Sequence, residues 1–226
     1  MTVVICAIAV GATACGADIP TDNQPNTPEL DPVAAGVGVV ANGCGLTSAI
    51  GSGVTIDHGG IPFVVSVAHT IRGATEVLVV DATGDEHAAQ VVSFDKDADL
   101  AALRVPTLTS TPLSLGDFVA GPGSMITWDR EIGVEQTAID VVKRLRITIE
   151  DIYNTGEFER TGLEIAGPVE SGDSGGPVLN EADNVIGIIY ANSRQRGGVG
   201  FATDTAEIRK LLDSVTDDVV DTGRCV

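Results

Sequence analysis

The chain has 226 residues, of which 43% are hydrophobic and 4% aromatic, and its formal net charge at pH 7 is −19. This length fits one domain, or one two-lobed unit, that buries a sizeable core. The strongly acidic balance excludes nucleic acid and anionic lipid as natural partners, because both carry the same sign of charge.

The N-terminal residues 1–15 resemble an export signal. Thr2 to Ala14 are apolar or small and include no acidic residue, a run as long as a signal-peptide core and too short to span a bilayer. Ala12-Thr13-Ala14-Cys15 resembles a bacterial lipobox, so we expect a lipid anchor on Cys15. An ordinary Ala-x-Ala cleavage site and an uncleaved anchor are the alternatives. Each predicts an exported bacterial protein, secreted or held at the cell envelope.

Residues 16–34 follow as a predicted flexible tether, because Asp, Asn, Thr and Pro dominate them and leave little to bury. The folded domain is predicted over 35–226, with a first lobe over about 35–110. Short runs rich in Val, Ile and Thr, bounded by turn residues, predict its strands. The runs are Leu46–Ile56, Ile61–Val67, Glu76–Asp81, Ala88–Phe94 and Leu100–Val105.

Residues 106–122 are rich in turn formers and read as a connector to a second lobe over about 120–204. Its strand-like runs are Ser124–Trp128, Gln136–Ile149, Gly162–Ala166, Pro177–Leu179, Val185–Ala191 and Val199–Thr203. Two sets of about six short strands predict an all-β fold of two packed antiparallel six-stranded β-barrels. After Asp204, a candidate N-cap, apolar residues recur three and four apart, which predicts a C-terminal helix over about 204–215.

The segment Gly172-Asp173-Ser174-Gly175-Gly176-Pro177 carries the clearest chemical signal. A serine nucleophile needs two backbone N–H groups that converge on the developing oxyanion, and a tight glycine-containing turn provides them. The alternative interpretation is an ordinary polar Gly-Ser loop.

An activated serine needs a base, and His69 is the best candidate among three histidines. It follows the apolar run Phe63–Ala68, so its imidazole lies at the end of a packed element. His58 and His87 lie in polar turns and are predicted to be solvated hairpin residues.

The base in turn needs a carboxylate that orients it in an apolar setting. Asp99 enters the run Leu100–Leu103, whereas Asp95 and Asp97 belong to the charged turn before it. Asp99 is therefore the predicted orienting group, with a strand or helix cap as the alternative role.

Three segments together resemble the catalytic motifs of the trypsin-like (chymotrypsin-fold) serine peptidases. They are Val67-Ala68-His69-Thr70, Asp97-Ala98-Asp99-Leu100-Ala101-Ala102-Leu103 and the serine segment 172–177. The order His, Asp, Ser matches this family and differs from that of subtilisins and α/β-hydrolases. The spacing is similar to that of compact bacterial members, including the protease domain of HtrA-type enzymes.

The resemblance implies a serine endopeptidase that cleaves protein or peptide substrates through an acyl-enzyme. Ser174 would attack the peptide carbonyl, His69 would move the proton, and Asp99 would hold the imidazole. The N–H groups of Gly172 and Ser174 would form the oxyanion hole. A catalytically quiet homologue that binds peptides or partners is the alternative.

The family pattern also implies a substrate pocket. Pro168 would form its base, and Tyr190, Ala191, Asn192 and Gly200 its walls. No acidic residue occurs among them, so the pocket is predicted to take a small or apolar P1 side chain.

Asp173 should be buried and should need a cationic partner. Arg130 is the predicted partner and Arg144 its rival. No basic residue followed by an Ile-Val-Gly-Gly-like start precedes Val37, so we expect an enzyme that needs no activating cleavage.

Cys44 and Cys225 are the cysteines outside the signal region. An oxidising compartment favours a disulfide between them over two free thiols. We expect a monomer without a cofactor. A metal site is not expected either, because the histidines lack ligand spacing and the acidic turn 95–99 lacks the glycine and glutamate of a calcium loop.

Overall fold

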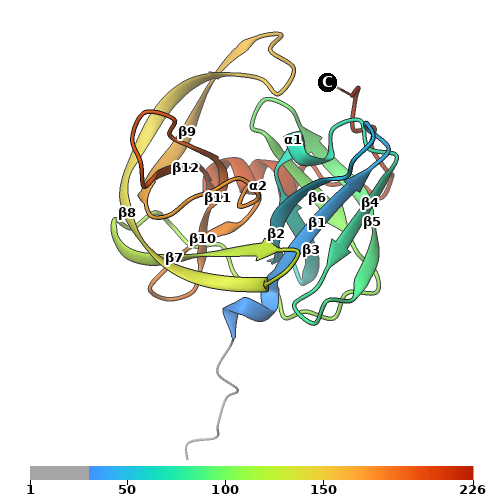
Figure 1. The fold of residues 1–226 in the computed structure, drawn as a ribbon, viewed down its shortest axis with the longest axis horizontal. Helices are drawn as coiled ribbons and strands as arrows, with labels where there is room; N and C mark the ends of the chain where they lie inside the picture. Colours follow the sequence, from blue (N-terminus) through green and yellow to red (C-terminus); the bar gives the residue numbers. More distant parts are fainter. Residues whose placement is uncertain (1–30, 226) are drawn as a thin grey trace, which may run out of the picture.

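The computed structural model describes residues 31–225, and they form two closed six-stranded antiparallel barrels packed side by side (Figure 1). Each barrel buries the inward-facing side chains of its alternating strands, as closure of a small barrel requires. The predicted two-barrel all-β fold with a C-terminal helix is confirmed.

The first barrel is built in the order β1-β2-β3-β6-β5-β4. Its strands are β1 (Gly36–Asn42), β2 (Ala49–His58), β3 (Ile61–Ser66), β4 (Glu76–Val80), β5 (Glu86–Asp95) and β6 (Leu100–Arg104). A 3₁₀ turn η1 (Pro32–Ala35) precedes β1, and a short helix α1 (Ala68–Ile71) follows β3. The sequence runs missed β1 and began β2 too early, because glycines interrupt β1 and the exposed Leu46 belongs to the intervening loop.

The second barrel is built in the order β10-β11-β12-β9-β8-β7. Its strands are β7 (Gly121–Asp129), β8 (Gly133–Glu150), β9 (Glu157–Ala166), β10 (Pro177–Asn180), β11 (Val185–Asn192) and β12 (Val199–Asp204). Strands β8 and β9 extend well beyond the barrel as a hairpin whose tip, 151–156, reaches the loop between β5 and β6 of the first lobe (Figure 1). The outer part of β8 alternates exposed polar residues with half-buried apolar ones.

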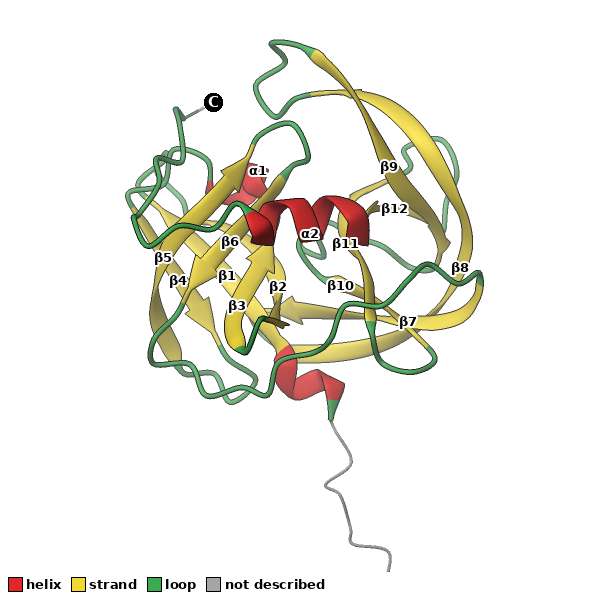
Figure 2. Cartoon of the chain, turned by 180° about the vertical axis from the view of Figure 1, so that it is seen from behind, coloured by secondary structure: helices red, strands yellow, loops and turns green. Residues whose placement is uncertain are grey.

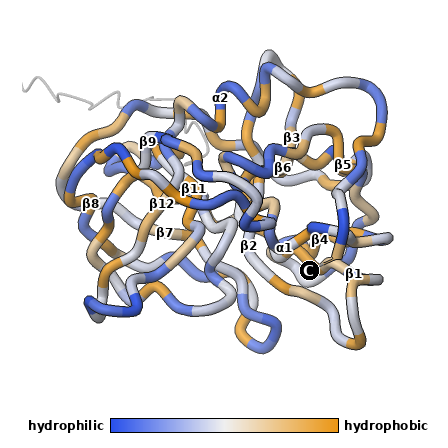
Figure 3. The backbone as a smooth tube through the Cα atoms, turned by 90° about the horizontal axis from the view of Figure 1, so that it is seen from above, coloured by the Kyte–Doolittle hydropathy of each residue, from blue (hydrophilic) through white to orange (hydrophobic). Residues whose placement is uncertain are grey.

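The C-terminal helix α2 (Thr205–Asp213) lies across the junction of the two lobes (Figure 2). Asp204 caps it by accepting the Ala206 N–H at 2.9 Å, as predicted. Ile208 and Leu211 enter a hydrophobic cluster with Ile56 of β2 and Ile188 of β11. The helix therefore helps to join both lobes into one core. Several hydrophilic turns of the chain lie at the periphery of the molecule (Figure 3).

The predicted disulfide is confirmed: Cys44, in the β1–β2 loop, is bonded to Cys225, with the Cα atoms 5.5 Å apart. The tail before Cys225 is held by Thr222, whose carbonyl accepts the Gly73 N–H and the Tyr153 hydroxyl, both at 3.0 Å. Gly73 follows α1 closely. The disulfide and the tail thus lie against Gly73, just after the helix that carries His69.

Cys15 and the predicted export signal lie outside the described residues. Among residues 31–225, no helix has the length and apolar character needed to cross a membrane.

Candidate active site

Ser174 lies on a tight turn between β9 and β10, and the glycines on either side make this turn possible. Gly172 and Gly175 have φ angles of +106° and +94°, a region that L side chains rarely adopt. A Cβ on Gly175 would lie 1.9 Å from the Ser52 carbonyl oxygen. The motif therefore packs the serine turn directly against β2 of the other lobe.

Ser52, which is fully buried on β2, anchors this turn. Its N–H donates to the Ser174 carbonyl at 2.8 Å, and its hydroxyl donates to the Gly172 carbonyl at 3.2 Å. The same hydroxyl accepts the Trp128 N–H at 2.9 Å, and the Ser66 hydroxyl donates to the Ser52 carbonyl. One serine side chain thus fixes the peptide orientation at the candidate oxyanion hole.

The serine turn contains both paired and unpaired N–H groups. In the described part of the chain, the N–H groups of Gly172 and Ser174 make no hydrogen bond, whereas those of Gly175 and Gly176 donate to Ile189 and Asp173. Two unpaired N–H groups beside a serine are what an oxyanion hole requires.

His69 and Asp99 form a hydrogen-bonded pair, although they come from different elements. The Asp99 carboxylate bonds His69 Nδ1 at 2.7 Å through Oδ2 and accepts the His69 backbone N–H at 2.9 Å through Oδ1. Asp99 is 7% exposed, so water does not compete strongly for these bonds. His69 lies in α1 rather than at the end of β3, because the strand ends at Ser66.

The serine turn meets α1 across Gly51. A Cβ on Gly51 would lie 2.8 Å from the Ser174 carbonyl oxygen and 3.0 Å from Thr70 Oγ1, and Thr70 is the residue after His69. Among the described residues, the His69 ring is bonded to Asp99 and not to the Ser174 hydroxyl. Serine–histidine bonds are commonly longer in ligand-free enzymes than in substrate complexes.

The predicted Asp173–Arg130 ion pair is wrong. Asp173 Oδ2 accepts the Glu170 N–H at 2.7 Å, and burial raises the pKa of this carboxyl group. Within residues 31–225, no cation pairs with Asp173. Arg130 lies in the exposed β7–β8 turn, and the rival Arg144 pairs with Asp204 at 2.9 Å. The serine loop is closed by its own backbone instead of by a distant cation.

The predicted pocket residues meet only in part. Asn192 and Gly200 are paired across β11 and β12, and both contact Val169: Asn192 Nδ2 donates to its carbonyl at 3.2 Å, and a Cβ on Gly200 would lie 2.5 Å from its Cγ2. Tyr190 and Ala191 precede Asn192 on β11. Pro168 instead lines a cavity of about 310 Å³ together with Gly172 and Asp173, and the other four predicted pocket residues are not part of its lining.

The two other histidines lie away from this site. His58 ends β2 and lies 3.5 Å from Asp213 of α2. His87 is less solvated than predicted: its Nε2 lies 3.0 Å from Asp81 and its Nδ1 lies 2.9 Å from the Thr107 hydroxyl.

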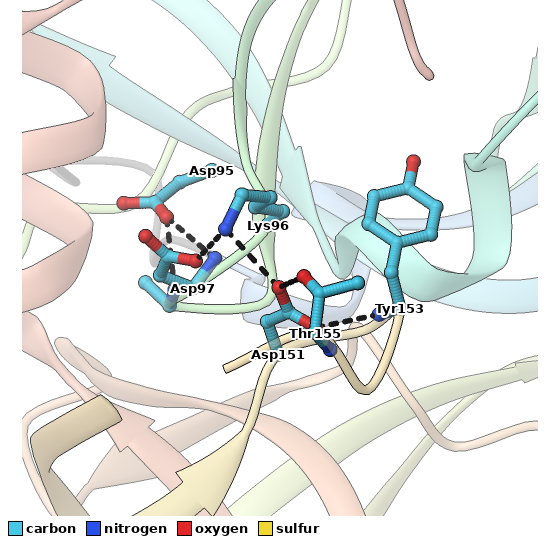
Figure 4. Close-up of polar contacts among 7 residues, drawn as sticks. Asp95, Lys96, Asp97, Asp151, Tyr153 and Thr155 are labelled. Atoms are coloured by element: carbon cyan, nitrogen blue, oxygen red, sulfur yellow. Dashed lines mark hydrogen bonds and ion pairs between the residues drawn. The ribbon is translucent and has the colours of Figure 1, made fainter. Parts of the chain in front are cut away.

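Sequence reasoning missed the second-lobe residues that reach the Asp99 loop. Lys96 contacts Asp97 and Asp151, and Asp95 accepts the Asp97 N–H (Figure 4). Arg160 of β9 donates to the Ala98 carbonyl. No sequence motif marks Asp151 or Arg160, because their contacts with the first lobe depend on the length of the β8–β9 hairpin.

Comparison with known proteins also indicates a trypsin-like peptidase. The family model of the trypsin-like peptidase domain matches residues 51–188. Serine protease Rv3671c of Mycobacterium tuberculosis is 30% identical over 169 residues, which are 72% of this chain and 42% of that protein. A probable periplasmic DegP-like serine endoprotease of Halomonas elongata is 31% identical over 182 residues, 75% of this chain and 36% of that protein. This chain spans about two fifths of the length of these curated relatives.

Solved structures share the fold. The active form of the Rv3671c protease has a TM-score of 0.79 at 24% identity, over 97% of this chain and 100% of that chain. The HtrA-type protease AlgW with a tripeptide has a TM-score of 0.67 at 24% identity, over 80% of this chain and 60% of that chain. With the family model matching more than half of its length, this chain belongs to the trypsin-like peptidase family.

Proposed function

We propose that this protein is a serine endopeptidase that works through Ser174, His69 and Asp99. The observation that carries the proposal is the hydrogen bond between His69 and the buried Asp99. This pair accompanies a serine turn in which the Gly172 and Ser174 N–H groups have no partner among the described residues. The name of the Rv3671c relative, a serine protease, supports the same activity.

The geometry supports a stepwise mechanism. Ser174 Oγ attacks the peptide carbonyl while His69 Nε2 takes its proton, and His69 then delivers that proton to the leaving amine. Asp99 fixes the imidazole with Nδ1–H toward the carboxylate and stabilises the imidazolium. The Gly172 and Ser174 N–H groups stabilise the oxyanion, and water then hydrolyses the acyl-enzyme by the reverse sequence.

The substrate preference that the site supports is a small apolar P1 residue. Val169 fills the space beside Gly200, and Asn192 reaches across to the Val169 carbonyl. Together they leave little room for a long side chain, and neither contributes the carboxylate that a basic P1 residue needs.

The enzyme is proposed to be active without an activating cleavage. In relatives that mature by cleavage, a new N-terminus pairs with the aspartate before the serine. Here the Glu170 N–H already occupies Asp173 Oδ2, which supports a serine loop that is ordered as synthesised.

Two assays test the proposal on the purified full chain without protease pretreatment. The first is labelling of the active site by a fluorophosphonate probe, and the second is hydrolysis of casein. We expect labelling and hydrolysis for the wild type, and neither for the Ser174→Ala variant. Well-folded wild-type protein that neither reacts nor cleaves would favour the quiet, peptide-binding homologue.

Export is part of the proposal. The periplasmic DegP-like relative and the Cys44–Cys225 disulfide support an oxidising compartment outside the cytoplasm. Lipidation of Cys15 is tested by mass spectrometry of the native protein and by its release from membranes in the Cys15→Ala variant. An unmodified mature N-terminus at another residue would contradict the lipid anchor and support simple secretion.

A further inference from the structure

Arg160 is a buried cation, and the free energy needed to bury its charge must be offset by other interactions in the fold. It lies on β9 with 4% of its surface exposed. Its Nη1 donates to the Ala98 carbonyl, and its guanidinium lies 4.3 Å from the centroid of the Tyr190 ring. Its Nε and Nη2 have no hydrogen-bond partner among the described residues. Burying a guanidinium with so few partners is unfavourable, and the Ala98 carbonyl is the one hydrogen-bond acceptor that it has among the described residues.

That carbonyl belongs to the peptide unit directly before Asp99. Asp99 has a φ angle of +54°, a backbone conformation that costs a non-glycine residue about 1–3 kcal/mol and persists only when its surroundings impose it. Arg160 holds the carbonyl of Ala98, while Asp95 Oδ1 accepts the Ala98 N–H at 2.9 Å. Both peptide groups of Ala98 are therefore fixed, and with them the direction of the Asp99 side chain.

Arg160 leaves the Asp99 carboxylate free for the histidine. Asp99 uses both carboxylate oxygens to bond His69, whereas Arg160 donates to the Ala98 carbonyl before it. Burial raises the pKa of the Tyr190 hydroxyl, Arg160 opposes this effect, and Asp99 reinforces it. The guanidinium and the catalytic carboxylate thus act on the same ring.

The same hairpin also holds the other end of the Asp99 loop. Lys96 Nζ lies 3.1 Å from Asp151 Oδ2 at the hairpin tip (Figure 4), and the Ile152 N–H donates to the Lys96 carbonyl. The loop 95–99 is therefore held at two points, by β9 and by the β8–β9 connection, which belong to the other lobe.

We propose that Arg160 is a positioning residue of the catalytic triad, which acts through the Ala98 carbonyl to hold the Asp99 carboxylate against His69. The inference rests on the proposed serine peptidase function. It gives the long β8–β9 hairpin a role in catalysis, because this hairpin carries the brace from one lobe to the other.

The experiment compares the full chain with its Arg160→Met and Arg160→Lys variants. Methionine keeps much of the volume without a donor, and lysine retains a donor and the charge. Arg146→Met is the matched control, because Arg146 lies on the same hairpin but is 77% exposed and pairs with the exposed Glu159. The measurements are kcat and KM on one peptide substrate, thermal unfolding, and the low-field proton resonance of His69 Nδ1–H.

We expect Arg160→Met to lower kcat by about 100-fold, the scale of a small misplacement of a catalytic group, with little change in KM. The low-field resonance should shift or broaden. Arg160→Lys should recover part of the kcat and part of the wild-type resonance. Arg146→Met should match the wild type in both measurements.

The proposal is overturned if Arg160→Met has the kcat and the resonance of the wild type. This holds even if its melting temperature is lower, because Arg160 would then support stability alone. If Arg160→Met does not fold, the lysine variant decides by the same two measurements. The resonance requires no turnover, so an inactive wild type whose resonance responds as expected would refute the proposed function and uphold the role of Arg160.

Discussion

Lys96 Nζ lies 3.1 Å from Asp151 Oδ2, and this contact joins the loop that leads to Asp99 with the tip of the β8–β9 hairpin. Asp151 is the centre of the tip, because its carboxylate also accepts the Tyr153 N–H at 3.0 Å and the Thr155 N–H at 2.8 Å. One buried carboxylate thus organises both the hairpin turn and its contact with the other lobe.

The stability of this contact should depend on pH through Asp151. Hydrogen bonds from the Thr155 side chain and backbone, together with Lys96, hold the pKa of Asp151 well below its ordinary value of 3.8. A carboxyl group whose pKa is lowered by folding stabilises the protein above its unfolded pKa, and this contribution is lost as the pH falls toward its folded pKa. We expect Asp151→Asn to lower the free energy of unfolding at neutral pH, and the difference from the wild type to shrink below about pH 4.

Urea denaturation at several pH values measures this effect. Asp97→Asn is the control, because Asp97 also contacts Lys96 but its side chain is 38% exposed, so its variant should show a smaller difference. Parallel pH profiles for Asp151→Asn and the wild type would contradict the prediction.

Ser52→Ala tests the anchor of the serine turn. The substitution leaves the buried Trp128 N–H without its acceptor and frees the Gly172 carbonyl, so we expect a loss of about 1–3 kcal/mol in unfolding free energy and a lower kcat. Ser93→Ala is a matched control, since Ser93 is also buried and hydroxyl-bonded, to Ser214 at 2.7 Å. The control should lose stability without a change in kcat. Equal kcat in both variants would show that Ser52 does not support the oxyanion hole.

Asp173→Asn should stabilise the protein at neutral pH. Burial raises the pKa of Asp173, so ionisation is less favourable in the folded state than in the unfolded chain. This penalty is present above the folded pKa and disappears as the pH falls below the unfolded pKa. Asparagine keeps an acceptor for the Glu170 N–H without the charge. We expect a higher melting temperature at pH 7, with the advantage over the wild type vanishing on acidification.

The exposed Asp218→Asn substitution removes the same formal charge elsewhere and serves as the control for net charge. If it raises the melting temperature as much as Asp173→Asn does, general repulsion in this acidic protein explains the gain, and the local penalty at Asp173 is refuted.

Val169→Ala should widen the P1 preference. Removing two methyl groups beside Gly200 opens space for a larger apolar side chain, and a methylene-sized change in such a pocket alters discrimination by about 1–3 kcal/mol. We expect kcat/KM for a P1 leucine or phenylalanine substrate to rise relative to P1 alanine by tenfold or more. Unchanged ratios in a peptide-library assay would show that Val169 does not limit the pocket.

Local patterns in the sequence predicted the two barrels, although the glycine-interrupted strand β1 was missed, and they singled out the residues of the proposed triad. Period-two runs specify strands, and His69, Asp99 and Ser174 stand in segments whose local chemistry is distinctive. The partner of Asp173 could not be read in this way, because a backbone N–H leaves no mark in the sequence. Arg160 is similar: an arginine on a charged hairpin resembles a solvated one until the hairpin is seen to cross to the other lobe.

The disulfide changes what a cut in this protein would do. The connector 106–120 is the backbone link between the two barrels, and Cys44–Cys225 provides a second covalent link, from the first lobe to the segment that follows the second. The chain is therefore closed into a ring. A single nick in the connector would leave both halves attached, so the nicked protein should migrate as one species without reductant and as two fragments with it.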